Sequence, residues 1–197
     1  MTNVLYKIFS KVLANKLKKI LPQIIIEYQN AFTKNRLISN NILVAFKTFH
    51  SMKNHKIGKT GYIALKLDMS KAYDKVEWSF LEKITRKLGF EERWKNLMII
   101  CVKIVSYSIL VNCEPKELIH PPRGIHQGNP LSSFLFLLCT EDLLSLISKV
   151  ENDGAIKGSS LSRRSPILTH LLFVDDSVLF CRSNRQLSKG VGNIGYL

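Results

Sequence analysis

The sequence predicts an α+β fold in which a small antiparallel sheet packs on helices. Apolar residues recur at helical spacing in five stretches, and short apolar segments of strand length lie between and after them. The composition agrees, because 46% of the 197 residues are hydrophobic, while glycine and proline are modest in number. A chain of this kind can form one domain with a real core, or a domain with a second lobe.

The helical stretches differ in how clearly the sequence marks their ends. Proline breaks the hydrogen-bond pattern of a helix interior, so the first helix is expected to end before Pro22. Gly89 is placed to cap the third helix, and Pro130 suits the first position of the fifth. The expected helices are residues 4–21, 40–55, 78–88, 91–103 and 130 to about 149. The residues expected to face inward from the second helix are Ile42, Leu43, Ala45, Phe46 and Phe49.

Strands are expected where apolar residues alternate or form short runs. Residues 62–68, with the sequence YIALKLD, show strand alternation. The apolar runs HLLFV and SVLF lie on either side of Asp175-Asp176, which predicts a hairpin with the aspartates at its turn.

The intervening segments are less regular. Residues 105–112 have strand character, and residues 113–117, CEPKE, are expected to form a turn. Residues 151–166 are expected to be loop with at most one short strand.

The chain is strongly basic. It has 29 Lys and Arg against 15 Asp and Glu, a net charge of +14. Residues 1–60 alone hold eleven Lys or Arg and a single acid, Glu27. A basic region of this kind attracts polyanions, nucleic acid first and an anionic membrane surface second. A soluble basic surface without a partner is the alternative.

Cysteine usage and hydropathy narrow the class of protein further. None of the four cysteines forms a CxxC pair or has a histidine at zinc-finger spacing, so neither a zinc site nor a disulfide partner is expected. Lysines interrupt the N-terminal apolar residues, which is unlike a signal peptide. The longest apolar stretch, residues 131–147, contains Glu141 and Asp142, which argues against a transmembrane segment. The expected location is intracellular, in the nucleus or cytoplasm.

Three aspartates are candidate metal ligands. Adjacent carboxylates at a hairpin tip, as in Asp175-Asp176, repel each other unless a cation is present, and Mg²⁺ prefers hard oxygen ligands. Asp68 ends a strand, where a rigid scaffold can hold a functional group. If these positions converge, they can hold two divalent ions. The alternatives are that aspartate is simply common in turns and that Asp68 caps the helix after it.

A loop before the last helix is the third candidate feature. In RGIHQGNPLS, residues 123–132, Gly124 and Gly128 permit close backbone approach and Gln127 offers an amide. The N-terminus of the helix that starts at Pro130 attracts phosphate. An ordinary connection between a loop and a helix is the alternative.

Three blocks, KLDMSKAYDKVEW, RGIHQGNPLSSFLF and LLFVDDSVLF, occur in that order and resemble the A, B and C blocks of reverse transcriptases. The flanking text NVLYKIFSKVLANKLKKILP, YQNAFTKNRLISNNILVAF and KLGFEERWKNLMIICV is similar to the LINE-type, non-LTR branch found in plant genomes. The resemblance covers the chain from about Asn3 to Asn184.

The resemblance implies a polymerase palm in residues 61–182, partial helical fingers in residues 1–60 and a divergent, truncated tail in residues 183–197. It implies an RNA-directed DNA polymerase that transfers a nucleotide from a dNTP to the 3′-hydroxyl of a DNA primer on an RNA template. The alternatives are a catalytically inactive, nucleic-acid-binding remnant of a retrotransposon and a membrane-surface protein that uses the first helix.

The resemblance also implies a metal site. Asp68, Asp175 and Asp176 are expected to hold two Mg²⁺ ions, or Mn²⁺, with help from the backbone carbonyl of Met69.

Four further residues are expected to contact the nucleotide or template. Tyr73 matches the aromatic gate that leaves no room for a 2′-hydroxyl. Gln127 and Gly128 match the block that supports the incoming nucleotide and template, and Arg36, in the fingers region, matches a phosphate contact.

The sequence departs from the family pattern at four positions. Where the family usually has Asp, Pro, Ala and Gly, this chain has Asn129, Ser133, Val174 and Cys113. Cys113 is expected to strain a turn that glycine would accept. Fingers residues before the first helix and a thumb after the C block are also expected in the family, so weak or absent activity is expected of the chain as it stands.

Overall fold

The computed structural model describes most of the chain, and two compact units can be distinguished in it. The first comprises Met1–Ile24 and Lys71–Thr140, and the second comprises Ile25–Ser70 and Glu141–Leu197. Arg36, Asp175 and the tail from residue 183 lie outside the described residues. The described residues are 4–25, 37–54, 61–154, 156–160, 165–173 and 176–182.

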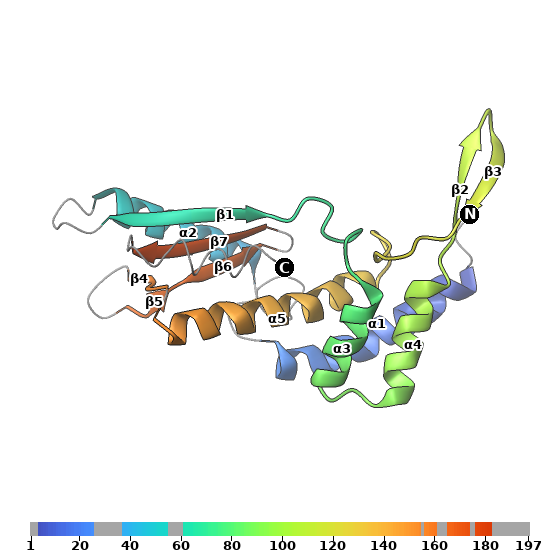
Figure 1. The fold of residues 1–197 in the computed structure, drawn as a ribbon, viewed down its shortest axis with the longest axis horizontal. Coiled ribbons are helices and arrows are strands. Elements are labelled where there is room, and N and C mark those ends of the chain that lie inside the picture. The colour runs from blue at the N-terminus through green and yellow to red at the C-terminus, as the bar shows by residue number, and fades with distance from the viewer. Residues whose placement is uncertain are drawn as a thin grey trace. The chain divides into compact units, whose positions relative to one another are not determined.

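A three-stranded antiparallel sheet forms the centre of the second unit (Figure 1). Its strand order is β1-β7-β6, with β1 at Tyr62–Asp68, β6 at His170–Phe173 and β7 at Asp176–Arg182. β1 pairs with β7 along its whole length, although the two strands are far apart in sequence. The predicted strand and the two strands of the predicted hairpin are therefore confirmed.

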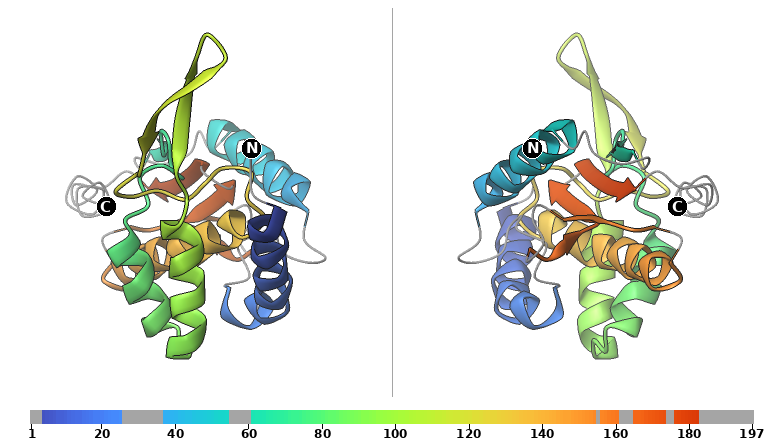
Figure 2. Two further views of the ribbon diagram at one scale, coloured as in Figure 1. Left: turned by 90° about the vertical axis from the view of Figure 1, so that its right-hand side faces the viewer. Right: turned by 90° about the vertical axis from the view of Figure 1, so that its left-hand side faces the viewer.

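Helices cover both faces of this sheet (Figures 1 and 2). α2, at Ile38–Asn54, packs on one face, and the second half of α5, at Ser132–Asn152, packs on the other. Side chains alternate between the faces because successive residues of a strand point in opposite directions. Towards α2 point Ala64, Leu171, Phe173, Val178 and Phe180, and towards α5 point Ile63, Leu65, Leu67, Leu179 and Cys181.

The prediction for the inward face of α2 is wrong in part. The buried residues are Asn41, Ala45 and Thr48, whereas Ile42 and Phe46 are more than half exposed. The Asn41 side-chain amide donates a hydrogen bond of 2.9 Å to the carbonyl of Leu172, which turns this face of the helix towards the sheet. Periodicity cannot reveal a polar anchor of this kind, and of the predicted residues Ala45 alone is buried.

The first unit is mainly helical. It contains α1 at Val4–Ile24, α3 at Trp78–Lys87, α4 at Glu92–Lys103 and the first half of α5. Gly89 ends α3 with a φ of +80°, its amide donating to the Arg86 carbonyl and the next amide, of Phe90, to Thr85. The predicted glycine cap is confirmed.

Three element boundaries differ from the predictions. α1 continues past Pro22 to Ile24, because a proline this close to the end of a helix removes only one hydrogen bond from the last turn. The segment CEPKE is not a turn but belongs largely to a strand, β3 at Glu114–Ile119, which pairs with β2 at Tyr107–Val111. α5 begins at Ser132, two residues after Pro130.

Two short strands complete the described structure, β4 at Ser159–Ser160 and β5 at Ile167–Leu168, which pair with each other. Among the described residues, no helix is both long and apolar enough to cross a membrane.

Candidate active site

Two of the predicted aspartates stand opposite each other at the end of a strand pair in the second unit. Asp68 closes β1, Asp176 opens β7, and the two are paired directly in the antiparallel register. Directly opposed residues have Cβ atoms about 4.5–5.5 Å apart and point to the same face. That face is the one covered by α2, since Ala64 and Val178 alternate in step with the aspartates. The third predicted ligand, Asp175, lies outside the described residues.

Lys66 supplies a positive charge to this pair of carboxylates. Its Nζ lies 3.1 Å from Oδ2 of Asp176. Like charges that face each other on paired strands destabilise a sheet, and the ammonium offsets this repulsion. Lys66 is the first residue of the A block, but the block alone gives it no role. Its spacing of two residues from Asp68 places both side chains on one strand face.

The donor set fits a divalent cation. Mg²⁺ is commonly bound by one or two carboxylates, with water and substrate phosphates as its other ligands. Asp68 is exposed and the side chain of Asp176 is 39% exposed, so a ligand can reach both carboxylates. The ammonium of Lys66 occupies the kind of position that a cation would take beside Asp176. Within the described part of the chain, no group of three or more His, Cys, Asp or Glu side chains could hold a metal ion.

Tyr73 lies in the first unit, in the turn between β1 and α3. Its ring stacks on the ring of Phe136 in α5, with centroids 4.8 Å apart and planes inclined by 18°. The Tyr73 carbonyl accepts a hydrogen bond of 2.9 Å from the amide of Ile125. The predicted gate residue is thus held both by its ring and by its backbone against the segment that includes the B block.

Gly124 makes this contact between the two blocks possible. Its φ is +94°, and a Cβ there would lie 2.9 Å from the carbonyl oxygen of Asp74. The Gly124 amide donates to Val76 at 2.8 Å, and its carbonyl accepts a hydrogen bond of 2.8 Å from the indole of Trp78. Trp78 therefore ties the start of α3 to the loop.

Gln127 and Gly128 form the exposed turn of this loop. Gly128 has a φ of +91° and no heavy atom within 4 Å of where a Cβ would be. Glycine is needed there for its backbone conformation and not for close packing. Both residues are accessible to a ligand, which the prediction that they support a nucleotide requires.

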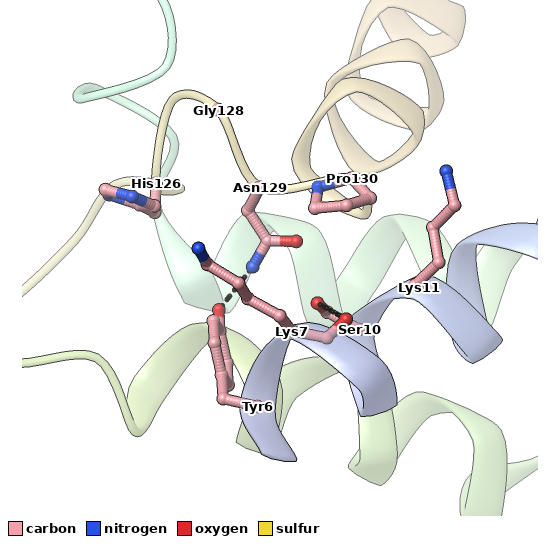
Figure 3. A pocket seen from close by; sticks show the side chains of 8 residues that line it. All are labelled: Tyr6, Lys7, Ser10, Lys11, His126, Gly128, Asn129 and Pro130. Atoms are coloured by element: carbon pink, nitrogen blue, oxygen red, sulfur yellow. Dashed lines mark hydrogen bonds between the residues drawn. The ribbon is translucent and has the colours of Figure 1, made fainter. Parts of the chain in front are cut away.

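Asn129 fixes the loop immediately after that turn (Figure 3). Its side-chain amide donates to the hydroxyl of Tyr6, and its side-chain oxygen accepts a hydrogen bond of 2.9 Å from the amide of Leu131. The Tyr6 hydroxyl in turn donates to the Cys101 carbonyl at 3.0 Å. Burial raises the pKa of Tyr6 to about 12, so its hydroxyl remains a proton donor. These hydrogen bonds link the loop to α1 and α4, and no sequence pattern indicates them.

A protein-family model described as reverse transcriptase (RNA-dependent DNA polymerase) matches residues 1–194. An uncharacterized mitochondrial protein of Arabidopsis thaliana is 44% identical over 68 residues, which are 34% of this chain and 56% of that protein. A retrovirus-related Pol polyprotein from a type-1 retrotransposable element R2 of Nasonia vitripennis is 32% identical over 135 residues, 68% of this chain and 12% of that protein. The chain therefore spans only part of the length of these relatives.

Solved structures of telomerase share the fold. Apo telomerase from Candida tropicalis, truncated from its C-terminal domain, has a TM-score of 0.59 at 15% identity, over 96% of this chain and 36% of that one. Telomerase from Candida albicans in complex with a fragment of telomeric RNA has a TM-score of 0.56 at 14% identity, over 94% and 31%. The α+β polymerase fold and the resemblance to non-LTR retrotransposons are confirmed. The chain belongs to the reverse transcriptase (RNA-dependent DNA polymerase) family.

Proposed function

We propose that this chain carries the catalytic core of an RNA-directed DNA polymerase, which extends a DNA primer on an RNA template. The observation that supports this most directly is the pairing of Asp68 with Asp176 at the end of β1 and β7. An exposed pair of carboxylates on a rigid sheet, in a chain of this family, suits cation-assisted phosphoryl transfer.

In the proposed reaction, the primer 3′-hydroxyl attacks the α-phosphorus of a dNTP. The new O–P bond forms as the bond between the α-phosphorus and the bridging oxygen of the β-phosphate breaks, the hydroxyl proton passes to water and pyrophosphate leaves. Two bound Mg²⁺ ions, or Mn²⁺, would neutralise charge on the phosphates and lower the pKa of the attacking hydroxyl. The chain itself contributes positioning: Asp68, Asp175 and Asp176 would hold the ions, while Lys66 pairs with Asp176 until an ion takes its place.

The remaining predicted residues would bind the nucleotide and template. The Tyr73 ring, fixed by its stacking on Phe136, would exclude a 2′-hydroxyl by its bulk. Gln127 and Gly128 would support the nucleotide from the exposed turn of the loop, and Arg36 would contact a phosphate.

We also propose a structural role for each region of the chain. Residues 61–182 would form the palm, residues 1–60 part of the fingers and residues 183–197 a divergent tail. The basic character of residues 1–60 supports a role in holding the phosphate backbone. The nucleus or cytoplasm, where RNA and dNTPs meet, would be the site of action.

The test is incorporation of a radiolabelled dNTP by the purified chain on a primed RNA template with Mg²⁺. Asp68→Asn and Asp176→Asn should each lower the rate by about 10²–10³-fold, the range seen when a group that stabilises transition-state charge is lost. Asp153→Asn, an exposed aspartate in the same unit, should leave the rate unchanged.

Two results would count against the proposal. If the wild-type chain incorporates nothing with Mg²⁺ or Mn²⁺, polymerase activity is excluded for this chain although its family membership stands. If it instead binds RNA in a salt-sensitive way that Asp68→Asn does not alter, the nucleic-acid-binding alternative is supported, for which the basic residues 1–60 are the specific observation.

A further inference from the structure

The β2–β3 hairpin of the first unit exposes a large apolar surface. Every residue of both strands is exposed, and the hairpin extends away from α3 and α4 (Figures 1 and 2). A two-stranded hairpin by itself is at best marginally stable in water, and further strands or a packed helix usually stabilise it. The large apolar side chains that it exposes by 40–68% are Tyr107, Ile109, Leu110, Val111, Leu118 and Ile119.

The two open edges of this hairpin differ in how well they are protected against a further strand. β3 contains Pro115, which has no N–H to donate, and three of its six residues are charged. It also carries a bulge, because the three steps from Pro115 to Leu118 stand opposite only two steps from Ser108 to Leu110. Prolines, charges and bulges keep an edge strand from pairing with another chain. β2, with the sequence YSILV, has no proline and no charge.

The backbone of β2 can accept a further strand at its open edge. Val111 and Glu114 flank the two-residue turn and are paired directly. Such a pair exchanges both of its hydrogen bonds, and along an antiparallel strand the residues alternate between bonding to one side and to the other. Ser108 and Leu110 therefore direct their N–H and C=O groups away from β3, towards the open edge.

A second copy of β2 matches this edge. In an antiparallel pair with a two-fold axis at Ile109, Ser108 of each copy faces Leu110 of the other, so the outward groups of both strands are satisfied together. Tyr107 then faces Val111, and an aromatic residue opposite a β-branched one is a favourable cross-strand pair. Because the strand is uncharged, two chains of net charge +14 can approach there with little local repulsion.

The exposed surface is also large enough for such an interface. The six apolar side chains carry on the order of 500 Å² of accessible surface, against roughly 800 Å² per partner in a standard interface. The strand backbone and Ile104, which is 65% exposed, add to this area. The resulting sheet has the order β3-β2-β2-β3, so it ends on both sides in the protected edge of β3 and association stops at two copies.

We propose that the open edge of β2 is a dimerisation surface, at which two copies of this chain join their β2 strands antiparallel into one four-stranded sheet. Neither the carboxylate pair of the second unit nor polymerase activity is needed for this pairing.

The first test is sedimentation velocity of the full, nuclease-treated chain over a range of concentrations. The wild type should dimerise. Leu110→Lys should raise the dimer dissociation constant by about tenfold or more, because an apolar contact is lost and a charge enters the interface at two related positions. The matched control is Leu118→Lys, the same change at a similarly exposed residue of β3, which should leave the dissociation constant unchanged. Circular dichroism checks that both variants fold.

The second test is a crosslink that reports the register. Directly opposed residues that exchange no hydrogen bonds have Cα atoms about 4.5 Å apart, which a disulfide can span. Ile109→Cys in a Cys113→Gly background, which lacks the exposed native thiol, should form an intermolecular disulfide with oxidised glutathione. Leu118→Cys in the same background should not.

Added salt should strengthen the dimer, because it screens the repulsion between two basic chains and leaves the uncharged edge unaffected. A monomeric wild type would overturn the proposal and leave the edge open to a strand of a different protein. A dimer that salt weakens, or equal effects of Leu110→Lys and Leu118→Lys, would also overturn it, because the copies would then associate through another surface.

Discussion

Lys66 places an ammonium 3.1 Å from Asp176, beside the strand position where Asp176 faces Asp68. The side chains of this ion pair are 60% and 39% exposed, so water screens it and its effect on stability is small. Its location matters more than its strength, because an internal cation competes with any divalent ion for the same carboxylate oxygen. Lys66 is thus expected to tune the affinity for metal while limiting repulsion in the metal-free chain.

Lys66→Met should therefore change two properties in opposite directions. Mg²⁺ should bind more tightly, by up to about fivefold, because an exposed ion pair is worth about 0.2–1 kcal/mol and no longer has to be broken. The metal-free chain should unfold at slightly lower urea, since the aspartates then face each other without a cation. Isothermal titration calorimetry and urea unfolding measure the two effects. Weaker Mg²⁺ binding by the variant would contradict this account of Lys66.

The Tyr6 hydroxyl is the other single group with a clear role, since it both accepts from Asn129 and donates to Cys101. Tyr6→Phe should lower the free energy of unfolding by about 1–3 kcal/mol, the cost of leaving buried polar partners unsatisfied. Tyr107→Phe is the control, because it also removes a hydroxyl but from an exposed side chain. Equal losses in the two variants would show that the Tyr6 link has no special role.

The pH dependence of that loss has a defined sign. The pKa of Tyr6 is raised from its ordinary value near 10 to about 12, chiefly by burial, so its protonated form is favoured in the folded chain. The stability that Tyr6 contributes is fully present below pH 10 and is lost as the pH rises towards 12. The difference between the wild type and Tyr6→Phe should narrow over that interval in urea unfolding. A constant difference would contradict the assignment.

Among the elements, the β2–β3 hairpin shows most clearly what a departure from the family does. Its turn residues Asn112 and Cys113 have φ values of 52° and 66°, the left-handed conformation that a two-residue hairpin turn requires. Asparagine accepts this conformation readily and glycine better still, whereas a cysteine side chain is strained there. The expectation that Cys113 strains a turn is consistent with its positive φ.

Cys113→Gly should relieve the strain and stabilise the hairpin by about 1 kcal/mol. Amide hydrogen exchange in β2 and β3 should slow by about fivefold, which corresponds to that free energy. Cys113→Ala keeps the Cβ and should give no such gain. Faster exchange in the glycine variant would show that the turn is not strained by its side chain.

The joint between the A and B blocks depends on Gly124 in a different way, through both conformation and space. Gly124→Ala should destabilise the chain by about 2–5 kcal/mol, because a Cβ would lie 2.9 Å from the Asp74 carbonyl at a φ of +94°. Gly154→Ala also has a positive φ but has open space around it, so it should cost only about 1–2 kcal/mol. Thermal unfolding measures both costs, and a similar loss of stability in Gly124→Ala and Gly154→Ala would rule out the steric part of this explanation.

At the scale of the whole molecule, the local sequence pattern predicted which residues form helices and strands better than it predicted which face of a helix is buried. The alternation of YIALKLD was sufficient to predict β1, because a half-buried strand alternates in polarity, and the apolar runs of the hairpin were sufficient to predict β6 and β7, which are largely buried. The inward face of α2 could not be predicted, since Asn41 anchors it through a distant carbonyl.

The residues of the candidate site likewise fall into those that the sequence predicts and those that only the structure reveals. The family motifs identify Asp68 and Asp176, and strand pairing brings them together. Lys66 and the link from Asn129 to Tyr6 emerge only from tertiary structure, because their partners are defined by register and packing and not by spacing in the sequence. The functional roles of all the predicted site residues remain predictions, and Asp175 and Arg36 also lie outside the described part of the chain.

The account depends centrally on Asp68 and Asp176 binding one class of ligand, a divalent cation. Electron paramagnetic resonance of Mn²⁺ measures this directly in the full chain, without any need for catalysis. The wild type should bind Mn²⁺, Asp68→Asn and Asp176→Asn should each weaken binding by about tenfold or more, and Asp153→Asn should not change it. Unchanged Mn²⁺ affinity in both Asp68→Asn and Asp176→Asn would contradict the assignment of this strand pair as the metal site.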